Sequence, residues 1–242
     1  MPEERALSEV LGYLFVFALI VSMTAIVYTT GFADLQQMRD VEETNNAERA
    51  FGILKHNVED LSERGAPQRA TEIQMSEAQL HTQQQTMVNV TVTNETGAQD
   101  PIQVHSNPII YETDGDEVVF SNGAVFRGID EDARMVQEPR FVLSEDRVLI
   151  PLTHTEGDES IGGTRTVLVR ADKQSSGLDI METEEQHDVS IEMETPRATA
   201  WEQYFEDEGF DCADTPDDEL SCELEEVDRT QVSRTHIEVE FE

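Results

Sequence analysis

The feature that most constrains how this chain can fold is an uncharged, mostly apolar run over residues 10–32, close to the N-terminus. About 20 apolar residues, at about 1.5 Å per residue, span the hydrocarbon core of a bilayer as a helix. The run is longer than the apolar core of about 7–15 residues in a secretory signal peptide, and no small-x-small cleavage site follows it cleanly. We therefore expect a transmembrane helix over residues 7–33 and a single pass through the cell membrane.

Beyond this run the chain is strongly acidic. It has 16 Lys+Arg against 52 Asp+Glu, a formal net charge of −36; residues 1–33 hold three Glu and one Arg, so −34 belongs to residues 34–242. Such self-repulsion opposes compaction in dilute salt, and molar salt screens it. Intrinsic disorder is the alternative, but the acids alternate with apolar residues and hydrophobics make up 38 % of the chain. An acid-rich, lysine-poor body resembles proteins of extreme halophiles, and its charge disfavours binding to nucleic acid.

Two patterns favour an extracellular location for the C-terminal domain. Cys212 and Cys222 stand in one acidic loop with no nearby histidine, which makes a weak metal site and favours a disulfide in an oxidising setting. Asn89 and Asn94 each begin an N-glycosylation sequon, a short pattern that often arises by chance. Orientation from basic residues is weakly determined, because only two arginines flank the span.

The segment before the apolar run has a distinctive order of residues. In Arg5-Ala6-Leu7-Ser8-Glu9, a basic and a small residue stand ahead of an uninterrupted hydrophobic helix. This resembles the class III signal of archaeal type IV pilin-like proteins, in which a prepilin peptidase cuts on the cytoplasmic side and the hydrophobic segment is retained. The resemblance implies a leader over residues 1–6, cleavage after Ala6, and Leu7 as the mature N-terminus.

The whole chain also resembles the uncharacterised haloarchaeal pilin-like surface proteins, through Asn45 to Phe51 (NNAERAF) and Arg64 to Pro67 (RGAP). One departure concerns the acidic residue common at the fifth mature position of bacterial pilins. Here Glu9 would be the third mature residue. Assembly through a carboxylate that meets a neighbouring N-terminal amine is therefore not implied.

Past the membrane, residues 34–64 predict an amphipathic helical extension. Its apolar residues recur mostly at three- and four-residue steps and so share one face; they are Leu35, Met38, Val41, Ala47, Phe51, Leu54, Val58 and Leu61. Gly65 and Pro67 are the expected stop signals. The result is one helix from residue 9 to residue 63, roughly 80 Å long. Its upper half packs on neighbouring helices or on its own head domain, and the pattern leaves both open.

From residue 71 the periodicity changes to two. Val88, Val90 and Val92 alternate with polar residues, and Asn122-Gly123 between apolar segments predicts a two-residue type I′ hairpin. Further strands are expected over residues 141–143, 147–152, 164–170, 189–194 and 236–241. The fold class is α+β: a long N-terminal helix, then an acidic, antiparallel β-rich extracellular domain over residues 65–242, a sandwich or a meander, formed as one unit or two.

One short helix is expected within this domain. Thr195 is a candidate N-cap and Pro196 a candidate first helical residue, while Trp201 and Phe205 share one face ahead of Gly209. The single tryptophan marks either a core position or an exposed ligand or partner site, and a core position is the commoner case.

Motifs of catalytic chemistry do not occur in the sequence. It has no Gly-rich phosphate loop, no Gly-x-Ser-x-Gly elbow and no His-Glu-x-x-His pattern, and no acidic cluster matches an EF-hand loop. The six histidines are scattered. We expect no enzyme, no metal site and no cofactor.

The sequence therefore favours a pilin-like, single-pass surface protein of a halophilic archaeon, structural in a surface appendage or envelope assembly. Its expected partners are the membrane, the prepilin peptidase and other pilin-like subunits. The alternative is a monomeric, membrane-anchored extracellular binding protein.

Overall fold

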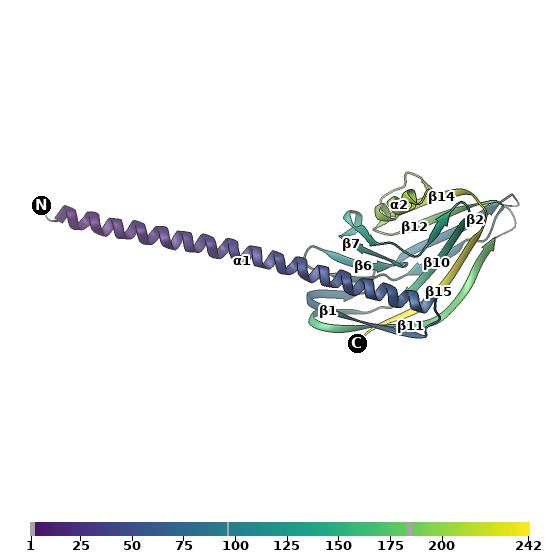
Figure 1. Cartoon of the computed structure of the whole chain (residues 1–242), viewed down its shortest axis with the longest axis horizontal. Coiled ribbons are helices and arrows are strands. Elements are labelled where there is room, and N and C mark those ends of the chain that lie inside the picture. Colours follow the sequence, from purple (N-terminus) through teal and green to yellow (C-terminus); the bar gives the residue numbers. More distant parts are fainter. Residues whose placement is uncertain (1–2, 96, 183–185) are drawn as a thin grey trace. The chain divides into compact units, whose positions relative to one another are not determined.

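Figure 1 shows the chain as a computed structural model, which describes residues 3–95, 97–182 and 186–242; the side chains of residues 3–10, 29–40 and 181–182 lie outside this description. The chain forms two compact units, Met1–Glu43 and Thr44–Glu242. Helix α1 (Glu3–Ser62) forms the first unit and enters the second.

In the first unit, polar side chains within the apolar segment bond to the backbone of their own helix. Ser22 Oγ donates to the carbonyl of Ala18 at 2.7 Å, and Thr24 Oγ1 donates to the carbonyl of Ile20 at 2.8 Å. These bonds to the residue four positions earlier satisfy both hydroxyls without water. The segment can therefore enter an apolar environment without leaving these donors unpaired.

Helix α1 ends where the stop signals predict. Gly65 has a φ of 70°, a left-handed conformation that glycine adopts without steric cost. The amide N–H of Ala66 donates to the carbonyl of Asp60 at 3.1 Å and so satisfies one of the last carbonyls of the helix. Pro67, which follows directly, cannot continue the helix.

The second unit contains a nine-stranded sheet with the order β8-β7-β6-β5-β1-β11-β15-β10-β9. In chain order its strands are β1 (Gln68–His81), β5 (Ile109–Glu112), β6 (Glu117–Ser121), β7 (Ala124–Arg127), β8 (Arg134–Gln137), β9 (Val142–Ser144), β10 (Arg147–Glu156), β11 (Ser160–Glu182) and β15 (Thr230–Phe241). Neighbouring strands are antiparallel except β10 and β15, which pair in parallel.

A smaller, antiparallel sheet of six strands has the order β13-β14-β12-β2-β3, with β4 also paired to β2. Its strands are β2 (Thr86–Asn94), β3 (Gly97–Ala98), β4 (Ile102–Ser106), β12 (His187–Glu194), β13 (Asp211–Cys212) and β14 (Glu219–Val227). A short 3₁₀ turn, η1 (Asp130–Asp132), and helix α2 (Ala198–Asp207) complete the unit.

The larger sheet lies between two hydrophobic cores. One core joins it to the C-terminal part of α1, and the other joins it to the smaller sheet and α2. Alternate residues of one strand serve the two cores: in β6, Val118 and Phe120 belong to the first core and Val119 to the second. The second unit is therefore a helix on a two-sheet sandwich, and the α+β prediction is confirmed.

The predicted hairpin is confirmed in its turn and in its register. Asn122 and Gly123 both have positive φ, 46° and 84°, as a type I′ turn requires. Ser121 pairs with Ala124 directly beside the turn. The primed turn matches the right-handed twist of the strands, which is why two residues suffice to connect β6 and β7.

The boundary of the head domain differs from the expected residue 65. The compact unit begins at Thr44, because α1 contributes Phe51, Leu54 and Leu61 to the core with at most 1 % of each residue exposed. Of the two arrangements that the sequence left open, the structure has the helix packed on its own head. Val41, expected on the same face, is exposed, and Leu35 and Met38 fall outside the described side chains.

The short helix begins later than predicted. Thr195 does not cap it: its Oγ1 accepts from the amide N–H of Arg197 at 3.3 Å, and α2 starts at Ala198 after a turn. The prediction that Trp201 and Phe205 share one buried face is confirmed, since both lie in the second core. Gly209 follows the helix with a φ of 94°.

Candidate functional site

The first candidate site is the apolar part of α1. One stretch, Leu11–Tyr28, is long and apolar enough to cross a membrane. Every side chain of that stretch is exposed, including Phe15, Phe17 and Ile20. Contiguous apolar surface of this kind is rare on proteins that stay in water and marks contact with a membrane or a partner. The segment can therefore serve as an anchor.

The expected processing residues lie at the beginning of the same helix. Arg5, Ala6 and Leu7 belong to α1 by their backbone, and their side chains lie outside the described part of the chain. Cleavage after Ala6 therefore stays a prediction.

The asparagines of the two sequons lie at different places on β2. Asn89 lies in the middle of the strand, between β12 and β4, and its Nδ2 donates to Glu192 Oε2 at 2.8 Å. A glycan on Asn89 would have to displace this bond. Asn94 is the last residue of β2 and is half-buried. Glycosylation at either position stays a prediction.

Cys212 and Cys222 form a disulfide that joins β13 to β14. The two residues stand opposite each other in register, and Cys222 is buried in the second core. The bond therefore fixes the acidic loop between these strands, next to the end of α2. Closing a loop of this length stabilises the fold mainly by restricting the unfolded chain.

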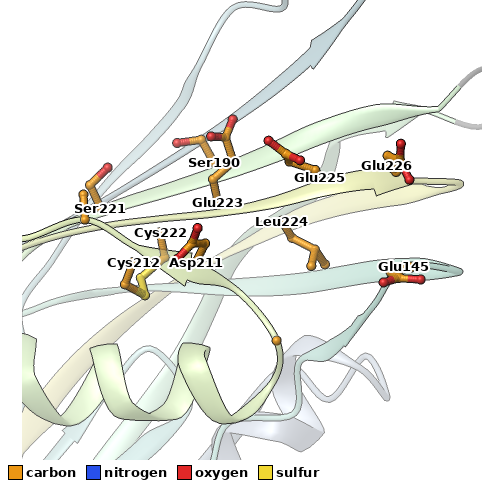
Figure 2. A pocket seen from close by; sticks show the side chains of 12 residues that line it. Glu145, Ser190, Asp211, Cys212, Ser221, Cys222, Glu223, Leu224, Glu225 and Glu226 are labelled. Carbon is orange, nitrogen blue, oxygen red and sulfur yellow. A yellow bond between two sulfur atoms is a disulfide. The ribbon is translucent and has the colours of Figure 1, made fainter.

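Beside the disulfide lies an open hollow of about 550 Å³ (Figure 2). Its charged lining is entirely acidic and comprises Glu145, Asp211, Glu223, Glu225 and Glu226. In Figure 2 Glu145 stands apart from the residues of β14. In a chain of this charge, such side chains form a solvated acidic surface, and we assign no ligand to it.

Another group of side chains comes from the paired strands β10 and β15. His154 stands directly opposite His236, and Glu156 stands opposite Glu238. The two imidazole rings stack with centroids 4.4 Å apart, and His236 Nε2 lies 2.8 Å from Glu156 Oε2. Burial, and then the neighbouring His236, lower the pKa of His154, so this imidazole is neutral at neutral pH.

In the sequence these histidines are scattered, and residues 154 and 236 lie far apart along the chain. The signal that could have found them is a repeated pattern, His-x-Glu, present as His154-Thr155-Glu156 and as His236-Ile237-Glu238. Alternation places both members of each pattern on one face of a strand. Only the parallel pairing of β10 with β15, a long-range feature, brings the two patterns side by side.

Comparison with known proteins gives one match. The model of the DUF7289 family, a family of unknown function, matches residues 5–240. No curated protein and no solved structure matches the chain.

Proposed function

The chain belongs to the DUF7289 family, and we propose that it is a pilin-like, single-pass cell-surface protein of a halophilic archaeon, structural in a surface appendage or an envelope assembly. The observation that carries the proposal is that one helix supplies both an exposed apolar segment and part of the core of the head. Residues 11–28 are exposed in the described part of the chain, whereas the apolar residues between 47 and 61 pack in the core against the larger sheet.

The C-terminal part of the same helix is held in the head by packing as well as by the peptide chain. Phe51, Leu54 and Leu61 are almost completely buried against the larger sheet. Burying one such side chain stabilises by about 1.5–3 kcal/mol. The head therefore cannot leave the helix without losing its own core, which suits a subunit that must hold its place in an assembly.

The proposed orientation has the head outside the cell. The disulfide between Cys212 and Cys222 suits an oxidising compartment. The acidic body suits a saline medium, where mobile ions screen the repulsion between carboxylates. The membrane, the prepilin peptidase and other pilin-like subunits are the partners that this function requires.

The experiment that tests the proposal is the identity of the mature N-terminus, measured by mass spectrometry on protein from the native membrane. The wild-type chain should begin at Leu7. An Ala6→Asp variant should retain its leader, because cleavage needs a small side chain beside the bond. The matched control, Pro2→Asp, adds the same charge away from the bond and should still begin at Leu7.

Membrane insertion should survive in both variants, since residues 10–32 are unchanged. A wild-type chain that begins at Met1 or Pro2 would overturn the pilin-like proposal. So would an Ala6→Asp chain that is cleaved as efficiently as the wild type.

A further inference from the structure

We propose that His154, Glu156 and His236 bind a divalent transition-metal ion, with Zn²⁺ as the matching ion. The three side chains offer two imidazoles and one carboxylate, and their ligand atoms lie within 4.8 Å of one another. This donor set suits Zn²⁺ and its neighbours in the first transition row, whereas Ca²⁺ and Mg²⁺ prefer oxygen ligands alone.

The backbone brings these donors together. Paired residues of a parallel ladder point to the same side of the sheet, so His154 and His236 share one face. Glu156 lies two residues after His154 and therefore shares it too. Neither imidazole is fully buried and Glu156 is exposed, so an ion from solvent can reach all three.

The distances require only a small adjustment. Two ligands of a tetrahedral zinc ion with bonds of about 2.0–2.1 Å are about 3.4 Å apart. His236 Nε2 and Glu156 Oε2 are already at 2.8 Å. The remaining separations are at most 4.8 Å, and the stacked rings would have to tilt for both imidazoles to face one ion.

The charges around the group also favour a cation. Glu238 stands opposite Glu156 and adds a second carboxylate on the same face, where it accepts a hydrogen bond from Gln174 Nε2 at 2.7 Å. The nearby cation, Arg234, is paired with Asp179 at 3.1 Å. Without a metal, His236 and Glu156 are joined by a hydrogen bond, and the two stacked rings pack against each other.

A bound ion would tie β10 to β15 at the end of their parallel ladder. Because the site exists only when the two strands are paired, an ion that binds it stabilises the folded state by mass action. The site therefore predicts a rise in melting temperature with Zn²⁺ concentration, independent of whether the protein forms filaments.

The test is calorimetric titration of the full chain in detergent with ZnSO₄, in molar KCl with a large excess of Mg²⁺ to occupy surface carboxylates. We expect one Zn²⁺ per chain and a higher melting temperature. His154→Gln and His236→Gln should each weaken binding at least tenfold. The matched control is His56→Gln, which removes an exposed histidine that contacts Glu59 but has no second imidazole beside it.

Binding that is unsaturable, or that is equal in all four proteins, would overturn the proposal. Loss of His236 could disturb β15, so a second measurement uses the wild type alone. Co²⁺ in place of Zn²⁺ should give the intense visible absorption of a tetrahedral site, saturating at one ion per chain. A spectrum of hydrated octahedral Co²⁺ at saturating concentration would also overturn it.

Discussion

Arg197 shows at the scale of one residue how this acidic protein uses its few cations. It lies directly before α2 with 1 % of its surface exposed. Its Nη1 donates to Gln84 Oε1 at 2.6 Å, and its Nη2 donates to Glu117 Oε2 at 2.9 Å. Burial lowers the pKa of the guanidinium, and the contact with Glu117 opposes that effect. The arginine thus joins the beginning of α2 to β6.

We expect Arg197→Ala to lower the free energy of unfolding by about 3–5 kcal/mol, because it leaves Glu117 poorly hydrated and without its cation. Urea unfolding in molar KCl, followed by the fluorescence of the single Trp201, measures the change. Arg134→Ala, at an exposed position, is the control and should change stability by less than about 0.5 kcal/mol. Equal effects from the two substitutions would contradict the role given to Arg197.

At the scale of elements, the C-terminal part of α1 acts as a layer of the head. Phe51 is completely buried against the larger sheet, whereas Ile53, two residues later on the same helix, is 57 % exposed. The difference follows from helical geometry, since residues two apart face different directions. Substitutions of Phe51 and Ile53 therefore distinguish the contribution of packing to stability from that of an apolar side chain as such.

Phe51→Ala should destabilise the head by about 3–5 kcal/mol, the usual cost of a large aromatic deletion in a core. Ile53→Ala should leave the urea midpoint almost unchanged. Trp201 lies in the other core and reports whether the whole unit unfolds together. A midpoint that Phe51→Ala leaves in place would mean that the helix is not part of the stable head.

Many helix ends, turns and strands could be predicted from the sequence, because the signals that specify them are local. The turn at Asn122-Gly123, the stop at Gly65 and the alternation of β2 each depend on adjacent residues. The order of the strands does not, and β11 was expected over residues 164–170 although it runs from Ser160 to Glu182. Its second half is polar, contains Gly177 and pairs with β15 through two register shifts. That half therefore lacks the alternation of apolar and polar residues from which a strand is predicted.

The candidate sites divide in the same way. The apolar segment and the Cys212–Cys222 bond follow from patterns within short stretches of chain. Two other pairs, Arg197 with Glu117 and His154 with His236, form between segments about 80 residues apart in the sequence. No local pattern specifies such contacts, because they exist only after the sheets have formed.

At the scale of the whole molecule, charge is the dominant feature. Arg170 illustrates how it is managed locally, since it pairs with Asp172, Glu240 and Glu242. With 16 basic residues against 52 acidic ones, however, most carboxylates have no cation of their own. We therefore expect mobile ions to screen the rest, so that the stability of the head depends on the salt concentration.

We predict that the head is folded in molar KCl and loses structure on dilution, because the Debye length grows from about 3 Å at 1 M to about 30 Å at 0.01 M. Circular dichroism and Trp201 fluorescence across a salt series measure this. NaCl should give the same midpoint as KCl, since screening depends on ionic strength. A fold unchanged at millimolar salt would contradict the prediction.

The mass of the complexes that the chain forms in its native envelope tests the proposal that it is a structural subunit held by its N-terminal helix. Sheared surface material and mild detergent extracts would be sized, and the N-terminus of the chain in each fraction determined. We expect assemblies of many copies whose chains begin at Leu7. A monomer in both fractions, beginning at Met1 or Pro2, would contradict it and favour an anchored binding protein.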